Sequence, residues 1–272
     1  MSTSARQVFG RSDQYHTSPD IPVYWAYRPP ILRSLCFHLA FLGGLLRRSR
    51  HLAVRGKFDE EAHAAAGLTY LRHVERAGGK FHVAGLNCLD RTSEPVVVAG
   101  NHMSFCETFV LAAMVGARKH KISFIIKESL ARYPLFGPVV SSTHPILVTR
   151  KNPREDLKRV MKLGAEALAQ GRSVIVFPQN RRRLTFRASE FNSIGAKLAR
   201  RAQVPLVPMA LRTDFLLPGR IFLDFGPIKP ERPLYFEFGP ALSPTGQSKD
   251  THRQTVAFIV DRLRKWGVPV AE

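Results

Sequence analysis

His102 and Glu107 are the residues of this chain whose types and spacing could do proton-transfer chemistry. A neutral imidazole can take a proton from a hydroxyl, and a carboxylate on its other nitrogen can orient it. On one straight helix, five residues correspond to about 500°, so the two side chains would point about 140° apart. They can meet only if His102 lies in the turn before the helix, which the Gly100-Asn101 pair favours. In a chain with ten histidines, such a pair is more often two unrelated polar residues.

The elements around this pair predict an α/β fold. The apolar run at 95–99 predicts a buried strand before His102, and residues 108–114 predict the start of a helix. Further strand-like runs lie at 81–85, 122–126, 146–149, 173–177 and 206–211, and helices are predicted at 60–78, 153–170 and 248–266. Strands alternating with helices imply a central mixed, largely parallel sheet flanked by helices.

Basic side chains follow three of these strands. Arg181 and Arg182 come after the run at 173–177, Lys127 follows 122–126, and Arg150 follows 146–149. The carboxyl ends of parallel strands meet at one edge of a sheet, where ligands usually bind. Guanidinium groups bind phosphate oxygens in a fork, so this edge could hold a phosphate. The competing interpretation is a solvated basic turn.

Composition restricts the partners and the kinds of site. Lys and Arg number 41 against 21 Asp and Glu, a formal charge of +20, which favours a polyanionic partner such as nucleic acid, an anionic bilayer or a phosphorylated substrate. The three cysteines, Cys36, Cys88 and Cys106, form no metal-binding or disulfide pattern. We therefore expect a reducing compartment and no metal site. Cys106 is expected to be a buried small residue and not a nucleophile.

The first 60 residues differ from the rest. Residues 1–20 are polar and predict a disordered tail, residues 21–60 predict a membrane-associating helical segment, and residues 61–272 predict one core domain. The apolar run within 31–46 is only about a dozen residues long, whereas a spanning helix needs about 20. Flanking aromatic residues and arginines favour a segment that lies in the membrane interface. The alternative is a helix buried against the core.

Four sequence blocks in order then identify a resemblance. They are Asn101-His102 to Glu107; Lys127-Glu128-Ser129-Leu130 with Arg150; Phe177-Pro178-Gln179-Asn180-Arg181-Arg182; and Val204-Pro205-Leu206-Val207-Pro208. In order and spacing, over roughly 80–240, they resemble the glycerolipid acyltransferase family, which includes the lysophosphatidic acid acyltransferases. One such block would be weak support, and four in sequence are strong.

The chain departs from the family pattern at two places. The acid of the first block is Glu107, where the family usually has Asp. The third block has Gln179-Asn180-Arg181, where the family has Glu-Gly-Thr. The first change keeps the charge and adds a methylene. The second removes a carboxylate and a glycine, which leaves open the polar-head specificity.

The resemblance implies transfer of a fatty acyl group from acyl-CoA or acyl-carrier protein to a hydroxyl of a lysophospholipid such as lysophosphatidic acid. It implies His102 as the general base, Glu107 as its orienting carboxylate and donors near the turn for the oxyanion. Arg182 would hold the acceptor phosphate, with help from Lys127, Arg150 and Arg181. No metal, cofactor or covalent intermediate is required beyond the acyl donor.

The partners implied are membrane lipids, the acyl donor and an anionic bilayer surface. We therefore expect a monotopic protein at the cytoplasmic face of the cell membrane. One alternative is a catalytically inactive lipid- or acyl-CoA-binding relative, which the altered third block motivates. Another is a nucleic-acid-binding protein, but the chain has no helix-turn-helix, zinc-finger or aromatic RNA-binding signature. The sequence leaves the acceptor, the acyl-chain length and the donor type open.

Overall fold

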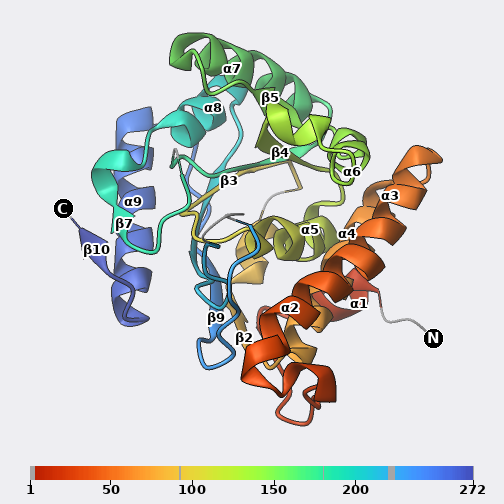
Figure 1. The fold of residues 1–272 in the computed structure, drawn as a ribbon. Helices are drawn as coiled ribbons and strands as arrows, with labels where there is room; N and C mark the ends of the chain where they lie inside the picture. Colours follow the sequence, from red (N-terminus) through yellow and green to blue (C-terminus); the bar gives the residue numbers. More distant parts are fainter. Residues whose placement is uncertain (1–3, 92, 180, 220–223, 272) are drawn as a thin grey trace.

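The computed structural model describes residues 4–91, 93–179, 181–219 and 224–271 (Figure 1). Its elements in chain order are α1 (Ala5–Phe9), β1 (Tyr15–His16), η1 (Trp25–Tyr27), α2 (Pro30–Ala40), η2 (Phe41–Leu46), α3 (Arg47–Val54), α4 (Glu60–Arg76), β2 (Phe81–Ala84), η3 (Leu86–Leu89), β3 (Val97–Gly100), α5 (Cys106–Lys119), β4 (Ile122–Lys127), η4 (Glu128–Arg132), α6 (Gly137–Ser142), β5 (Ile146–Val148), α7 (Pro153–Ala169), β6 (Ser173–Val176), β7 (Phe186–Arg187), η5 (Ala188–Glu190), α8 (Ile194–Ala202), β8 (Leu206–Arg212), β9 (Leu234–Phe238), α9 (Ser248–Lys265) and β10 (Val270–Ala271).

A central sheet carries the fold, with strands in the order β1-β2-β9-β8-β3-β6-β4-β5. The strands β8, β3, β6, β4 and β5 are mutually parallel. At the other side, β9 pairs antiparallel with β8 and parallel with β2, and β1 pairs antiparallel with β2. The predicted mixed, largely parallel sheet is confirmed. The parallel set places the segments that follow β8, β3, β6, β4 and β5 along one edge.

Helices cover both faces of this sheet because the strands are apolar on both sides. Val97, Ala99 and Val176 pack with α7 and α8, while Val98 and Ile175 belong to the core cluster shared with α4 and α5. Figure 1 shows α7, α8 and α9 on one side of the sheet and α4 and α5 on the other. Such alternation along fully buried strands is what a sheet between two helical layers requires.

The helices and strands that the sequence predicted are present with boundaries close to those expected. The helix α7 begins after Asn152, whose side chain accepts from the backbone N–H groups of Arg154 and Glu155. In α8, a Cβ on Gly195 would lie 3.1 Å from Ala99 and 3.1 Å from Val176, so the glycine allows this helix to approach the sheet. The antiparallel strand β9 was not predicted, although Leu234–Phe238 alternates between buried and half-buried positions.

The expectation of a disordered tail at 1–20 differs from the structure. Within the described part of this tail, α1 buries Phe9 completely and β1 pairs with β2. The hydroxyls of Tyr15 and Thr17 donate to the buried carboxylate of Glu75 at 2.6 and 2.7 Å. The polar residues that suggested disorder have structural roles: Ser4 caps α1, and Tyr15 and Thr17 are hydrogen-bond partners of the buried Glu75.

The apolar segment forms one continuous helix in which α2, the π-helical η2 and α3 follow without a break. Within the residues that the structure describes, this stretch, Pro30–Val54, is the one helix long and apolar enough by length and composition to cross a membrane. It is longer than the sequence predicted, because the helix continues through the arginines after residue 46. Its inner side packs on the domain through Phe37, Phe41 and Leu46, each 1% exposed.

Candidate active site

His102 and Glu107 meet as predicted. His102 lies between β3 and α5, and Glu107 is in the first turn of α5. The Nδ1 atom of His102 lies 2.5 Å from Oε2 of Glu107. Since a carboxylate only accepts, Nδ1 carries the hydrogen, and in the neutral imidazole Nε2 then keeps a lone pair. The imidazole is 16% exposed, so a substrate hydroxyl could reach it.

The Glu107 carboxylate is fully buried and its second oxygen is held by three donors. Oε1 accepts from the backbone N–H of Met103 at 2.8 Å and of Ser104 at 2.6 Å, and from the hydroxyl of Thr213. Ser104 in turn donates its hydroxyl to Thr213 Oγ1 at 2.9 Å. A buried carboxylate is costly unless its lone pairs are satisfied. The turn and the end of β8 therefore fix Glu107 with one oxygen directed at the histidine.

The imidazole of His102 is also fixed by the segment that follows β6. Its ring stacks on the ring of Phe177, with centroids 4.3 Å apart and planes at 12°. Its backbone N–H donates to Oε1 of the buried Gln179 at 2.7 Å, and its carbonyl accepts from the backbone N–H of Arg183 at 2.9 Å. The first and third sequence blocks are thus joined by backbone and ring contacts. The third block supports the histidine directly.

Asn101 closes the strand before the histidine. Its amide nitrogen donates to the Leu211 carbonyl at 2.8 Å, and its side-chain oxygen accepts from the Leu211 N–H at 2.9 Å. The side chain thereby extends the β3–β8 pairing by one position. At Gly100 a Cβ would lie 2.9 Å from the Met209 carbonyl oxygen, so only glycine allows this approach. Both residues set the point at which the chain leaves the sheet and turns to His102.

Cys106 is a buried structural residue, as expected. It is fully buried, and burial followed by the nearby Glu107 charge raises the pKa of its thiol. Its Sγ lies 3.1 Å from the Ser104 hydroxyl oxygen. A thiol in this state is a poor nucleophile at neutral pH.

Three backbone N–H groups of the turn already have acceptors within the protein. The N–H of His102 donates to Gln179, and those of Met103 and Ser104 donate to Glu107. These three groups serve the histidine and its carboxylate. Any oxyanion must therefore be stabilised by other donors.

Two of the predicted phosphate ligands, Arg150 and Arg182, interact electrostatically. Arg182 forms an ion pair with Asp224, at 30% and 35% exposure of the two side chains. The pKa of the Arg150 guanidinium is lowered by burial and then by the positive charge of Arg182. Two guanidinium groups that repel each other are a favourable place for an anion. Arg150 is held there by a left-handed backbone, φ 58°, and by its N–H, which donates to Asp156 at 2.7 Å.

The other two predicted ligands are not brought into this pair by any described contact. Lys127 is exposed at the carboxyl end of β4, opposite Val148 in the register with β5, and Arg181 is exposed after β6. Both lie on the same sheet edge as the arginine pair. Arg183 is instead held by a two-pronged contact with Glu190, 3.1 Å for each nitrogen. Asn180 lies outside the described residues.

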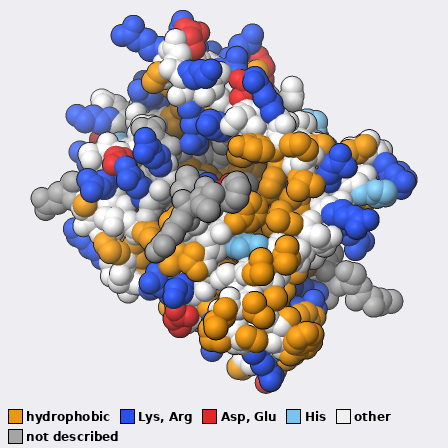
Figure 2. All heavy atoms as spheres, viewed as in Figure 1, with side chains coloured by type: hydrophobic (Ala, Val, Ile, Leu, Met, Phe, Trp, Pro, Cys, Tyr) orange, Lys and Arg blue, Asp and Glu red, His pale blue; other side chains and the backbone are white. Residues whose placement is uncertain are grey.

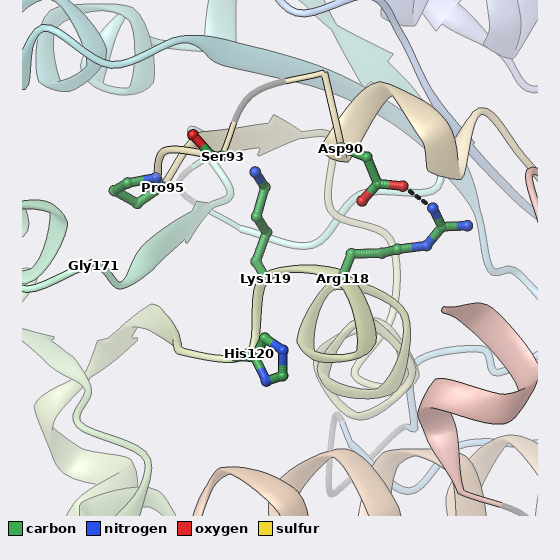
Figure 3. A pocket seen from close by; sticks show the side chains of 7 residues that line it. All are labelled: Asp90, Ser93, Pro95, Arg118, Lys119, His120 and Gly171. Carbon is green, nitrogen blue, oxygen red and sulfur yellow. Dashed lines mark hydrogen bonds and ion pairs between the residues drawn. The ribbon is translucent and has the colours of Figure 1, made fainter. Parts of the chain in front are cut away.

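A separate pocket of about 340 Å³ lies at the opposite edge of the sheet (Figure 3). The pocket is lined by the segments that precede β3, β4 and β6, and its lining includes Pro95, Lys119 and Gly171. Arg118 pairs there with Asp90, and the Lys119 ammonium donates to the Glu94 carbonyl at 2.9 Å. This pocket is therefore remote from the dyad. Across the described ranges, no group of three or more His, Cys, Asp or Glu side chains could hold a metal ion.

Comparisons with known proteins agree with this geometry. The family model described as Acyltransferase matches residues 80–212. This range contains His102, Glu107 and all four predicted phosphate-binding residues. The 1-acyl-sn-glycerol-3-phosphate acyltransferase of Pseudomonas aeruginosa is 27% identical over 190 residues, 70% of this chain and 68% of that protein. Residues 80–212 of the chain form an acyltransferase domain. The enzyme class predicted from the sequence, an acyltransferase of glycerophospholipid synthesis, is confirmed at the level of this family.

Two further relatives of this acyltransferase define the extent of the similarity. The chloroplast 1-acyl-sn-glycerol-3-phosphate acyltransferase BAT2 of Brassica napus is 30% identical over 135 residues, 48% of this chain but only 37% of that longer protein. The crystal structure of the 1-acyl-sn-glycerophosphate acyltransferase PlsC from Thermotoga maritima has a TM-score of 0.66 at 15% identity, covering 89% of this chain and 98% of that one. The fold of this acyltransferase is therefore that of PlsC.

Thr213, Phe177 and Gln179 are the site residues whose roles the sequence did not predict. Thr213 is a polar residue directly after a predicted buried strand, which is a usable signal for a site residue. Phe177 and Gln179 lie inside the third block, but nothing in their types indicates a ring stack or an acceptor for a backbone N–H. They reach His102 because β6 pairs in parallel with β3, so that the segments after the two strands lie side by side.

Proposed function

We propose that this acyltransferase moves a fatty acyl group from acyl-CoA or acyl-carrier protein to the free hydroxyl of a lysophospholipid, with lysophosphatidic acid as the preferred acceptor. The observation that carries the proposal is the 2.5 Å contact between His102 and Glu107 at the sheet edge that also holds the Arg150–Arg182 pair. The relatives are 1-acyl-sn-glycerol-3-phosphate acyltransferases, which supports the choice of acceptor.

In the proposed reaction, His102 acts as the general base. Its Nε2 takes the proton of the acceptor hydroxyl as that oxygen attacks the thioester carbonyl. Glu107, hydrogen-bonded to Nδ1, stabilises the imidazolium that forms and keeps the ring in place. The tetrahedral intermediate then collapses with cleavage of the carbon–sulfur bond, and the imidazolium returns its proton to the leaving thiolate. An ester is formed and a thiol is released.

The acceptor phosphate is proposed to bind between Arg182 and Arg150. Burial and then the Arg182 charge lower the pKa of Arg150, and binding of a dianion there would relieve the repulsion between the two guanidinium groups. Asp224, which pairs with Arg182, would hold that guanidinium in place before the phosphate binds. Lys127 and Arg181, exposed on the same edge, would contribute longer-range attraction.

We propose a monotopic position on an anionic bilayer at the cytoplasmic face of the membrane. The helix Pro30–Val54 suffices in length for a span, but its inner side is packed on the domain. The Nε2 of His38 lies 2.7 Å from the Gly226 carbonyl, which ties α2 to the domain. The Ser34 hydroxyl accepts from the Ile228 N–H at 3.1 Å. A helix tied to the domain along its length supports a segment that lies on the membrane.

An acceptor panel tests the proposed function. Purified protein is given labelled acyl-CoA or acyl-carrier protein with lysophosphatidic acid, other lysophospholipids or no acceptor, and products are separated by thin-layer chromatography. We expect acylated lysophosphatidic acid, and a rate that falls about 100- to 10,000-fold in His102→Ala. His16→Ala, at an exposed position on β1, is the matched control and should keep full activity. Binding of lipid and acyl-CoA without turnover would identify the inactive relative instead.

A further inference from the structure

Exposed hydrophobic side chains are concentrated in two places on this protein. Among the described residues, eight of the twelve exposed large hydrophobic side chains lie between 23 and 54, on η1, α2 and α3 and in the two residues before η1. Two more are Tyr133 and Leu135, in the connection between η4 and α6, at 55% and 45% exposure. The remaining two, Leu163 and Leu184, lie elsewhere. The connection 133–135 is thus a second apolar surface, which begins 79 residues after the end of the first in the sequence.

The two surfaces lie on the same face of the molecule. Figure 2 shows hydrophobic side chains over the part of this face where Figure 1 places α2, and again beside α6. Lys and Arg side chains cover α3 next to them, and a hollow opens at their edge near the junction of β3 and α5. Of the charged residues just before 133–135, Lys127 and Arg132 are basic, and Arg132 forms an ion pair with Glu128.

The connection is held firmly while these two side chains stay exposed. Between them, the Pro134 carbonyl accepts from Nε of Arg50 on α3 at 3.0 Å, and the Tyr133 carbonyl accepts from the Gly137 N–H at 2.6 Å. The next residue, Phe136, turns inward, with its ring 6.4 Å from that of Phe41. Exposure of two apolar side chains on a fixed loop is costly in water and calls for a partner.

We propose that Tyr133 and Leu135 form a second bilayer contact, which acts together with α2 and seats the active-site opening on the membrane. The inference rests on the proposed lysolipid acceptor. A lipid surface is favoured over a protein partner because the patch continues the apolar surface of α2 and is bordered by arginines, as at a membrane interface. Tyrosine, with an apolar ring and a polar hydroxyl, suits the headgroup level.

The contact lies close to the catalytic turn. Phe136 packs 6.1 Å from Phe105, measured between ring centroids, and Phe105 is the residue before α5, two positions from Glu107. Phe105 also contacts Phe41 of η2 at 5.6 Å. One aromatic cluster therefore joins both apolar surfaces to the segment that carries the dyad. An acceptor that leaves the bilayer between them would enter beside His102.

The test compares Leu135→Glu with Leu163→Glu, which places the same charge at an exposed leucine of α7. The full chain is mixed with vesicles of phosphatidylcholine and phosphatidylglycerol, and binding is measured by flotation. Acyl transfer is then measured with lysophosphatidic acid presented in these vesicles and in detergent micelles. We expect Leu135→Glu to weaken vesicle binding and vesicle-based activity about tenfold, with micelle activity unchanged. Leu163→Glu should match the unmodified protein in all assays.

Three outcomes would overturn the proposal. The first is vesicle binding by Leu135→Glu equal to that of Leu163→Glu. The second is an equal loss of activity in vesicles and micelles, which indicates a structural role. The third is unchanged vesicle binding with activity lost only when acyl-carrier protein is the donor, which identifies the patch as a protein-docking surface. If the unmodified protein acylates no lysolipid in micelles, the proposed function fails, while flotation still decides the membrane contact.

Discussion

The hydroxyl of Thr213, at the end of β8, donates to Oε1 of Glu107, 106 positions earlier in the chain. Both side chains are fully buried. With two backbone N–H groups on the same oxygen, the carboxylate has its other oxygen, Oε2, for His102. Thr213 is therefore a positioning residue, which acts on the histidine through the carboxylate.

Replacing Thr213 by Val should lower kcat and leave KM for the acceptor nearly unchanged. Loss of one hydrogen bond to a buried charge corresponds to about 1–2 kcal/mol, or roughly a 5- to 30-fold lower kcat if it acts fully on the orientation of the dyad. The measurement is steady-state kinetics on the purified variants. Thr213→Ser restores the hydroxyl and should recover most of the rate. If Ser and Val variants are equally slow, the methyl group and not the hydroxyl is what matters.

Shortening Glu107 to Asp should be harmful even though Asp is the family's usual residue. In this chain the turn and Thr213 are set for the longer side chain, so Asp cannot reach both His102 and its donors. We expect at least a tenfold lower kcat for Glu107→Asp, and a similar or larger loss for Glu107→Gln, which removes the charge. Thermal unfolding of each variant provides the control for folding. An Asp variant as fast as the unmodified enzyme would show that the site adapts to either length.

The dyad could be predicted from sequence because its two residues are close in the chain. A histidine after an apolar strand and a carboxylate in the next helical turn leave few arrangements, and the structure has the one that places the histidine in the turn. The parallel sheet could be predicted for a similar reason, since apolar strands alternate with clear helices such as Pro153–Ala169. Local patterns determine both features.

The remaining site features depend on contacts between distant segments. Gln179 holds the His102 N–H from the end of β6, and Asp224 pairs with Arg182 from beyond β8, and no local pattern specifies such partners. The order at 4–20 was missed for the same reason, because Tyr15 and Thr17 are ordered by Glu75 on α4. Polar residues look unstructured in sequence until their buried partner is known.

Replacing Arg182 by Ala should mainly weaken binding of a phosphorylated acceptor. A charge-assisted pair is worth about 1.5–3 kcal/mol, so KM for lysophosphatidic acid should rise by roughly 10- to 100-fold. KM for an uncharged acceptor, monoacylglycerol, should change little, and KM for acyl-CoA serves as a second control. Arg182→Lys keeps the charge but loses the fork, and should be intermediate. An equal effect on both acceptors would assign Arg182 a structural role through Asp224.

Acid should weaken the docking of α2 through His73. Burial lowers the pKa of this histidine to about 4, and its Nε2–H donates to the Phe37 carbonyl of α2 at 3.0 Å. Between pH 6.5 and 4 the unfolded chain binds a proton that the folded protein excludes, so stability falls as the pH falls through this window. At pH 5 the loss attributable to His73 should be about 1–2 kcal/mol.

The measurement is the free energy of unfolding in urea at pH 7.5, 6.5, 5.5 and 5.0, for the unmodified protein and for His73→Gln. Glutamine can still donate to the Phe37 carbonyl but does not titrate, so the variant should lose less stability on acidification. His63, whose pKa burial also lowers to about 4, contributes equally to both proteins and cancels in the comparison. His16→Gln, at an exposed position, should follow the unmodified protein. Parallel pH profiles for the unmodified protein and His73→Gln would show that His73 is protonated as readily in the folded state as in the unfolded one.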